Sequence, residues 1–246
     1  MLSMSRRSTR PSRSPRCTHS QYPWRTIMAR ESPTSAVEII LQRRVSAILR
    51  THDQSLARNA MSAAVAGGFR MIEFTLTIPG APALIAEFAK QRDLLVGAGT
   101  VLTIDDARRA VEAGAQFLVS PVCDPAVIAE ARRLGVAAIP GTFTPTEMLE
   151  AHRAGAAFVK LFPSPHDVAG YVSAVLGPLP FLRIFPTAGV TPDNFVDVLQ
   201  AGATGVGFVK SLFEPEDMRA GAFASIERRA HNIMSKLESV AAVRAT

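Results

Sequence analysis

The sequence predicts a single-domain α/β protein, folded as a (β/α)8 TIM barrel with one additional helix at its N-terminal end. Within residues 36–240, eight short apolar segments alternate with segments of helical periodicity. Strands and helices that alternate in this way form right-handed βαβ units and a parallel sheet. Eight such units in about 200 residues match a compact barrel. An open doubly wound sheet is the alternative, but no glycine-rich dinucleotide turn follows the first strand.

The elements are expected at regular intervals along the chain. After a helix at 36–44, strands are expected at 45–50, 71–77, 94–99, 117–120, 136–140, 158–162, 182–186 and 205–212. Helices are expected after them at 53–66, 81–92, 104–113, 126–134, 144–154, 168–176 and 192–201, and a long final helix at 215–237. Glycine follows several of these helices, which is a common signal of a helix C-terminus.

Composition excludes several classes of protein. No apolar run approaches the roughly 18–20 residues that a membrane-spanning helix needs. Cys17 and Cys123 are the only cysteines, so a disulfide framework and a cysteine-based metal site are both excluded. A reducing, cytoplasmic compartment fits this cysteine usage best.

The net charge of +6 belongs to the start of the chain. Residues 1–36 contain seven arginines and a single acid, Glu31, and the remaining residues carry 20 basic and 20 acidic side chains. The globular part is therefore neutral and offers no nucleic-acid surface. Residues 1–35 are rich in Arg, Ser and Pro and are expected to be a disordered basic extension. They either act as an organelle transit peptide or are a non-functional extension, with the true start at Met28.

Lys160 is the most unusual residue of the predicted core. It lies at the centre of the apolar run 158–163, in a chain that has 4 lysines against 23 arginines. A buried lysine can lose its proton and become a nucleophilic amine, whereas an arginine cannot be deprotonated. One interpretation is a Schiff base between Lys160 and a carbonyl substrate. The other is a lysine whose stem follows the strand and whose ammonium reaches water.

Strand parity places a second reactive group near this lysine. On strand 71–77, Ile72 and Phe74 share the face toward the helices, so Glu73, Thr75 and Thr77 point into the barrel. The same alternation turns Lys160 inward together with Phe158 and Phe162, and turns Val159 and Leu161 toward the helices. An acid and two hydroxyls facing a barrel interior are typical of an active-site wall, although a buried structural salt bridge is the alternative.

Arg50 and Thr100 complete the predicted site at its rim. They end the first and third strands, and in a barrel the chemistry lies at the C-terminal ends of the strands. A cation and a hydroxyl there are suited to binding a carboxylate. The cation and the loss of water would both lower the pKa of the Lys160 amine.

From about Val37 to Lys236, the chain resembles the class I 2-keto-3-deoxy-6-phosphogluconate (KDPG) aldolases. The resemblance includes their 4-hydroxy-2-oxoglutarate (KHG) and 2-keto-3-deoxy-6-phosphogalactonate relatives. It is carried, in order, by Ala47-Ile48-Leu49-Arg50, Ala66-Gly67-Gly68, Ile72-Glu73-Phe74-Thr75, Gly97-Ala98-Gly99-Thr100-Val101, Ala113-Gly114-Ala115-Gln116-Phe117, Ser120-Pro121, Ile139-Pro140-Gly141, Val159-Lys160-Leu161-Phe162-Pro163 and Pro186-Thr187-Ala188-Gly189-Val190. Each segment alone is weak evidence, but the set in this order is highly specific.

The resemblance implies a lyase that cleaves a carbon–carbon bond and releases pyruvate. It implies that Lys160 forms the Schiff base, that Glu73 is the general acid/base, that Arg50 and Thr100 bind the pyruvate carboxylate, and that Pro140 and Phe162 line the pocket. The partners are then a small 2-keto acid and an aldehyde, without a metal or other cofactor, and the assembly is a homotrimer. The remaining substrate-binding residues are expected to be Thr75, Thr77, Thr187, Ala188, Gly189, Gly207 and Lys210.

The chain departs from the family where the distal phosphate of the substrate is bound. The two loops concerned usually read Thr-Gly-Gly and Gly-x-Gly-Ser, but here they contain Ala188, and Val209 and Lys210 after Gly207. Valine does not readily adopt the positive φ that glycine permits, so the backbone cradle for phosphate is expected to change. Lys210 either binds a distal anion or points outward from the rim. A substrate without phosphate, an isomerase on the same fold, and a non-catalytic binding protein therefore remain alternatives.

Overall fold

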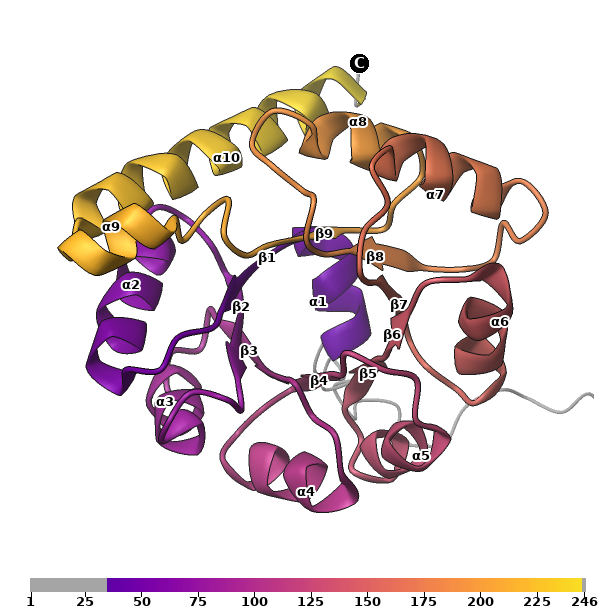
Figure 1. Ribbon diagram of the computed structural model, residues 1–246, viewed down its shortest axis with the longest axis horizontal. Helices are drawn as coiled ribbons and strands as arrows, with labels where there is room; N and C mark the ends of the chain where they lie inside the picture. The colour runs from indigo at the N-terminus through magenta and orange to yellow at the C-terminus, as the bar shows by residue number, and fades with distance from the viewer. Residues whose placement is uncertain (1–34, 245–246) are drawn as a thin grey trace, which may run out of the picture. The chain divides into compact units, whose positions relative to one another are not determined.

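The computed structural model describes residues 35–244 of the 246-residue chain and shows an α/β fold with parallel strands. Strands and helices alternate as expected, and Figure 1 shows the helices arranged around a ring of strands. None of the described helices is long and apolar enough to cross a membrane. The predicted basic extension, residues 1–35, lies outside the described residues apart from Ser35.

Most elements begin and end close to their expected limits. The strands are β1 (Val45–Leu49), β2 (Met71–Thr75), β3 (Leu95–Gly99), β4 (Phe117–Val119), β5 (Ala137–Ile139), β6 (Gly141–Thr142), β7 (Val159–Leu161), β8 (Ile184–Pro186) and β9 (Val206–Phe208). The helices are α1 (Ala36–Arg43), α2 (Gln54–Ala66), α3 (Ala81–Phe88), α4 (Ile104–Glu112), α5 (Pro125–Arg133), α6 (Pro145–Arg153), α7 (Val168–Leu176), α8 (Phe195–Gln200), α9 (Pro215–Ala220) and α10 (Phe223–Arg244).

Hydrogen bonding divides the strands into two parallel sections. One section has the order β5-β4-β3-β2-β1-β9, and the other has the order β6-β7-β8. Pro140 separates β5 from β6 and has no N–H to donate to a neighbouring strand, but its carbonyl accepts a 2.8 Å hydrogen bond from the Lys160 amide. At the other end, a parallel bridge pairs Thr187 with Gly207. Both sections therefore curl toward each other at their ends.

The strand parity predicted from the sequence is confirmed within β2 and β7, but not for Thr77, which lies beyond the end of β2 and is exposed. Ile72, Phe74, Val159 and Leu161 belong to the apolar layer between strands and helices, whereas Phe158 belongs to a separate cluster with side chains such as Phe185. This second cluster is the interior of the sheet, and Ile40 of α1 is part of it. The interior beneath the lysine position is thus filled with apolar side chains, and α1 contributes to it from the N-terminal end of the strands.

Three expected elements were wrong in their limits. The final helix is broken at Gly221, which takes φ 64°, so α9 and α10 replace the single helix expected at 215–237. The last strand ends at Phe208 rather than at 212, because the Val209 carbonyl accepts hydrogen bonds from the amides of Leu212 and Phe213 and the chain turns there. Strand β2 also ends at Thr75, which leaves Thr77 in the following turn.

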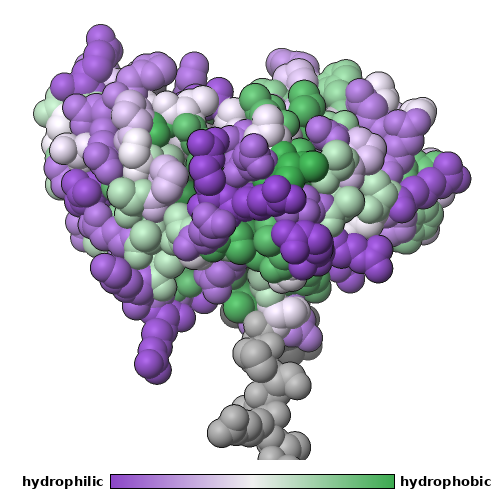
Figure 2. Space-filling model, turned by 90° about the horizontal axis from the view of Figure 1, so that it is seen from below, coloured by the Kyte–Doolittle hydropathy of each residue, from purple (hydrophilic) through white to green (hydrophobic). Residues whose placement is uncertain are grey.

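The surface mixes apolar and hydrophilic side chains. Figure 2 shows this from the side of α4, where apolar patches reach the surface between hydrophilic side chains. Three of the exposed large apolar residues lie in successive loops after β3, β4 and β6: Leu102, Val122 and Phe143. They therefore follow the C-terminal ends of neighbouring strands.

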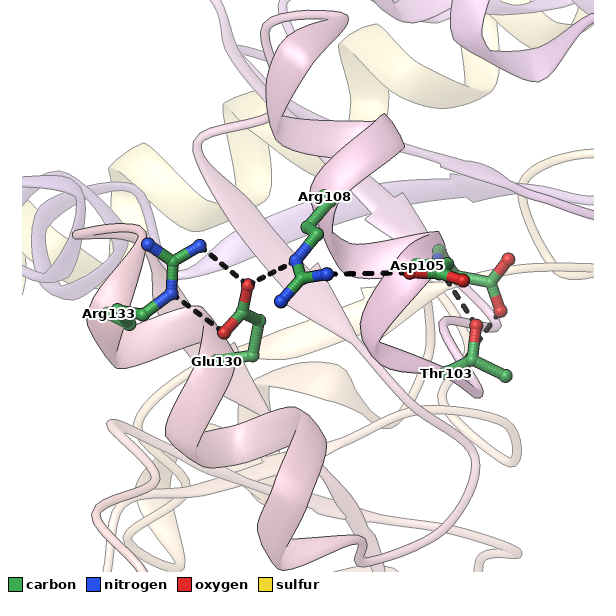
Figure 3. A network of polar contacts seen from close by, with 6 residues as sticks. Thr103, Asp105, Arg108, Glu130 and Arg133 are labelled. Carbon is green, nitrogen blue, oxygen red and sulfur yellow. Dashed lines mark hydrogen bonds and ion pairs between the residues drawn. The ribbon is translucent and has the colours of Figure 1, made fainter.

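A buried carboxylate connects two of the outer helices. Glu130 of α5 accepts hydrogen bonds from Arg133 at 2.7 and 2.8 Å and from Arg108 of α4 at 2.7 Å (Figure 3). The Glu130 side chain is 8% exposed, and Arg108 also lies 3.6 Å from Asp105. The hydrogen bonds from Arg133 and Arg108 lower the pKa of Glu130 to about 2. This network stabilises the contact between α4 and α5.

Replacing Glu130 with glutamine is expected to make the free energy of unfolding less sensitive to pH in the acidic range. Since the pKa of Glu130 is lowered from 4.5 to about 2 in the folded protein, its contribution is present above about pH 4.5 and is lost as the pH falls toward 2. Glu130→Gln should therefore lower the free energy of unfolding at pH 7, and the difference from wild type should shrink below pH 4.5. Urea unfolding at a series of pH values measures this. The matched control is Glu150→Gln on the exposed side of α6, and a constant deficit at all pH values would contradict the expectation.

Candidate active site

A cavity of about 490 Å3 opens at the C-terminal ends of the strands. Its wall contains most of the residues that the sequence predicted for the site: Arg50, Glu73, Thr75, Lys160, Phe162, Thr187, Ala188, Gly189 and Lys210. They come from β2 and β7 and from the segments that follow β1, β7, β8 and β9. Residues as far apart in the sequence as Ile48 and Phe213 thus meet in one cavity.

Lys160 occupies the middle of β7 and is 8% exposed. Its Nζ lies 5.0 Å from the centroid of the Phe162 ring. Burial lowers the pKa of the Lys160 amine; Glu73 opposes this shift, and the positive charge of Arg50 adds to it. The net effect favours the neutral amine, which is the nucleophilic form of lysine.

Glu73 lies at the centre of β2 and is 2% exposed. Gly99 on the neighbouring strand β3 makes room for it, because a Cβ atom on Gly99 would lie 1.9 Å from Glu73 Oε1. Burial raises the pKa of Glu73, while Lys160 and Arg50 oppose the shift. Burial lowers the pKa of the Lys160 amine and raises the pKa of the Glu73 carboxyl, and both shifts favour the uncharged form of the group.

Two pairs of polar side chains lie beside this acid and amine. Arg50 Nη2 donates a 3.0 Å hydrogen bond to Thr100 Oγ1, and the hydroxyls of Thr75 and Thr77 are 2.9 Å apart. Thr100 takes a positive φ of 60°, which is costly for a threonine. The strained backbone presents the Thr100 hydroxyl to the guanidinium and fixes one side of the Arg50 fork.

The loops after β8 and β9 form the outer end of the cavity. Ala188 and Gly189 both have positive φ values, 55° and 67°, and Ser164 Oγ donates to the Ala188 carbonyl at 2.5 Å. Ser211 Oγ donates to the Val190 carbonyl at 2.7 Å and so connects the two loops. Alanine thus adopts the left-handed backbone at 188. Lys210 is exposed at the rim of the cavity.

Four predicted residues do not line this cavity. Thr77 is exposed and Thr100 is half-buried, and each is hydrogen bonded to a residue that does line the cavity. Pro140 lines a separate small space beside Ser120 and Val101, and Gly207 lies between β1 and Thr187. Sequence reasoning also did not assign a site role to several lining residues: Ile48, Val190, Thr191, Ser211 and Phe213. Strand parity with Arg50 could have identified Ile48, but the others lie in loops whose course the sequence does not specify.

Within residues 35–239, no three His, Cys, Asp or Glu side chains are arranged so that they could hold a metal ion. The groups that the cavity offers for chemistry are the amine of Lys160, the carboxyl of Glu73, the cation of Arg50 and the hydroxyl of Thr75, whereas the hydroxyl of Thr187 is buried behind its wall.

Comparison with known proteins gives consistent matches. Residues 37–229 match the family model described as KDPG and KHG aldolase. A probable 2-dehydro-3-deoxy-6-phosphogalactonate aldolase of Rhizobium meliloti strain 1021 is 35% identical over 76% of this chain and 91% of its own. A KHG/KDPG aldolase of Escherichia coli strain K12 is 33% identical over 68% of this chain and 79% of its own.

A solved structure agrees with these sequence matches. The structure described as native KDPGal superimposes with a TM-score of 0.72 at 28% identity, over 79% of this chain and 94% of its own. The family model covers far more than half of the chain, and it spans every strand and the cavity described above. This chain belongs to the KDPG and KHG aldolase family.

Proposed function

We propose that this protein is a class I aldolase, a lyase that cleaves a 2-keto-3-deoxy-6-phosphosugar acid or 4-hydroxy-2-oxoglutarate to pyruvate and an aldehyde. The observation that carries the proposal is the buried pair of Lys160 and Glu73 in the wall of the main cavity. Burial favours a neutral amine, and a neutral amine is what attack on a ketone requires. The names of the relatives cover both phosphorylated sugar acids and KHG.

Binding begins with the pyruvate end of the substrate. The cation of Arg50, held by Thr100, faces the cavity beside Thr75, and this arrangement suits a carboxylate. A carboxylate held there brings the adjacent C2 ketone toward Lys160. The amine adds to C2, the uncharged Glu73 carboxyl gives its proton to the carbinolamine hydroxyl, and loss of water leaves a protonated imine beside the ionised Glu73.

Glu73 then acts on the C4 hydroxyl. The positive charge on the imine nitrogen favours the charged form of Glu73 and so opposes the effect of burial, which raises the pKa of Glu73. The ionised Glu73 is then a base. Glu73 takes the C4 hydroxyl proton, the C3–C4 bond breaks, and its electron pair moves into the imine. The aldehyde leaves, Glu73 returns the proton to C3 of the enamine, and hydrolysis of the resulting imine releases pyruvate and restores Lys160.

We infer that the two sheet sections close into one eight-stranded (β/α)8 barrel. The inference rests on the hydrogen bond from the Lys160 amide to the Pro140 carbonyl and on the bridge between Thr187 and Gly207. The first joins the β5–β6 strand to β7, and the second joins β8 to β9. Strands β5 and β6 then count as one barrel strand interrupted at Pro140.

The distal end of the substrate is proposed to meet Lys210. The cavity there is bounded by the apolar side chains of Val190, Val209 and Phe213, with Lys210 at the rim and Ser211 already bonded to the Val190 carbonyl. Val209 is not one of the described residues that have a positive φ. A side-chain cation, rather than a glycine-based backbone cradle, is thus the group that this end offers to a distal phosphate or carboxylate.

A homotrimer is proposed as the assembly. Leu102, Val122 and Phe143 are 49%, 50% and 39% exposed, and they follow neighbouring strands. Exposed large apolar side chains in adjacent loops are suited to an interface between copies of one chain.

Trapping with pyruvate and borohydride tests the central proposal. Reduction of the imine should attach pyruvate irreversibly to Lys160 and abolish activity, because the protonated imine is reduced to a stable amine. Peptide mass spectrometry locates the adduct. Lys160→Ala should give no adduct and should lower kcat by about 10³-fold or more. Labelling at Lys210, or no label in an active enzyme, would contradict the proposal; the second result would favour an isomerase or another chemistry without a Schiff base.

The control for this experiment is Glu73→Gln. It keeps the shape of the side chain and the amine of Lys160 but removes the base, so it should still be labelled by pyruvate while kcat for cleavage falls by about 10²-fold or more. A variant that loses labelling and cleavage together would instead indicate that Glu73 has a structural role.

Replacing Lys210 tests the distal contact. Lys210→Ala should lower kcat/KM about tenfold for a 6-phosphorylated substrate and for 4-hydroxy-2-oxoglutarate, since both lose a charged partner. Cleavage of an analogue with an uncharged distal end should be unchanged. The matched control is Lys90→Ala, an exposed lysine after α3. Equal losses on charged and uncharged substrates would show that Lys210 does not recognise the distal charge.

The molar mass in solution tests the assembly. Light scattering should give three times the mass of the chain, 26.3 kDa. Val122→Glu should weaken the trimer, because a charge at the interface loses its hydration. A monomeric wild-type mass would refute the homotrimer.

A further inference from the structure

Two buried hydroxyl groups near the Lys160–Glu73 pair have no hydrogen-bond partner within residues 35–244. They are Ser46 Oγ and Thr187 Oγ1. The two residues are only 1% and 2% exposed, so bulk water does not reach them. A buried hydroxyl that makes no hydrogen bond is costly, and buried polar groups in proteins are almost always satisfied by protein or by ordered water.

The two hydroxyls lie on either side of Gly207. Ser46 of β1 pairs in register with Gly207 of β9, and Gly207 is bridged on its other side to Thr187. Neighbouring strands are about 4.8 Å apart, so two strand spacings separate the Ser46 and Thr187 backbones. Glycine keeps the space between them clear: a Cβ on Gly207 would lie 2.4 Å from Ile48 Cδ1 and 2.7 Å from Thr187 Cγ2.

A small internal cavity joins these hydroxyls to the reactive pair. It has about 10 Å3 of space, and its polar wall consists of Ser46, Glu73, Lys160 and Thr187. The rest of its wall is apolar and includes Met71, Phe117, Val119, Ile139 and Phe185. This volume is about that of one water molecule, and the wall offers the two to four polar partners that a buried water needs. This cavity shares Glu73, Lys160 and Thr187 with the wall of the main cavity, and most of the rest of its wall belongs to the apolar interior of the sheet.

We propose that this cavity binds a single water molecule, held by Ser46 and Thr187, which contacts the Lys160–Glu73 pair from the side opposite the substrate. Ser46 is then a positioning residue that acts through this water. The catalytic consequence of this proposal rests on the proposed function. The water site itself does not, because it follows from the two hydroxyls and the cavity. Its chemical role is to keep one polar contact on a pair that is otherwise removed from water.

Removal of the water should change the pH at which Lys160 loses its proton and becomes nucleophilic. Burial already lowers the pKa of the Lys160 amine, and the charged groups that act on it are Glu73 of β2, which raises the pKa, and Arg50 after β1, which lowers it. Substitutions at Ser46 leave both of these groups in place. Loss of a polar contact to the ammonium form should lower the pKa of Lys160 further. The inflection of imine formation against pH should therefore move to lower pH.

Ser46→Thr and Ser46→Val provide a matched pair for the test. Their side chains have the same shape, and only threonine keeps the hydroxyl, so the steric cost of the added methyl is common to both. The rate of borohydride trapping with saturating pyruvate, measured against pH, should show an inflection about one unit lower in the Val variant than in the Thr variant. Thermal unfolding confirms that both variants are folded, and Ser46→Ala repeats the loss of the hydroxyl without added volume.

A high-resolution crystal structure of the wild-type protein tests the site directly. It should show one water oxygen within hydrogen-bonding distance of both Ser46 Oγ and Thr187 Oγ1, and the Val variant should lack it. An empty cavity in the wild type, or equal inflections in the Thr and Val variants, would overturn the proposal. If the wild type formed no adduct with pyruvate at Lys160, the proposed function would fail, whereas the crystal structure would still decide whether the water is bound.

Discussion

The site depends on one constraint: an amine and a carboxyl group must be kept out of water and close to each other. Strand parity turns Lys160 and Glu73 to the interior, while the apolar residues on either side of them face the helices. The cluster of phenylalanines beneath them fills the interior from below, and Gly99 leaves the volume that the Glu73 carboxyl occupies. The apolar core is therefore what gives the lysine its reactive form, as well as what stabilises the fold.

Burial also gives the pair two charge states in one catalytic cycle. In the free site, desolvation dominates both groups, and the pair is favoured as neutral amine and neutral acid. Formation of an imine on Lys160 introduces a fixed positive charge a short distance from Glu73, and an opposite charge lowers the pKa of a carboxyl group. Under the proposed mechanism, Glu73 thereby becomes a base only after the substrate is covalently attached. Arg50, at the rim, is proposed to bind the carboxylate of the substrate rather than to transfer a proton.

The sequence predicted the strands, their parity and the inward residues because each depends on a local pattern of two or three residues. It did not predict features that depend on contacts between distant segments. Val209 has an apolar β-branched side chain that favours a strand, but its carbonyl is taken by the amides of Leu212 and Phe213, and the strand ends. Ser211 became part of the cavity wall through its hydrogen bond to Val190, which lies 21 positions earlier. The glycine at 221 was misread because a helix tolerates an isolated glycine, and only its φ of 64° ends the helix.

The two ends of the cavity are formed by different kinds of structural element. The pyruvate end is formed by side chains on β1, β2 and β7, whose positions are fixed by the register of the sheet. The distal end is formed by loops, where substitutions change the lining without disturbing the strands. Ala188 shows that a loop can keep its left-handed backbone without glycine, at a cost in strain, whereas Val209 adopts another course. Under the proposed function, substitutions at Val209 and Lys210 would change recognition of the distal group and leave the chemistry at Lys160 unchanged, because the strand that carries Lys160 does not include them.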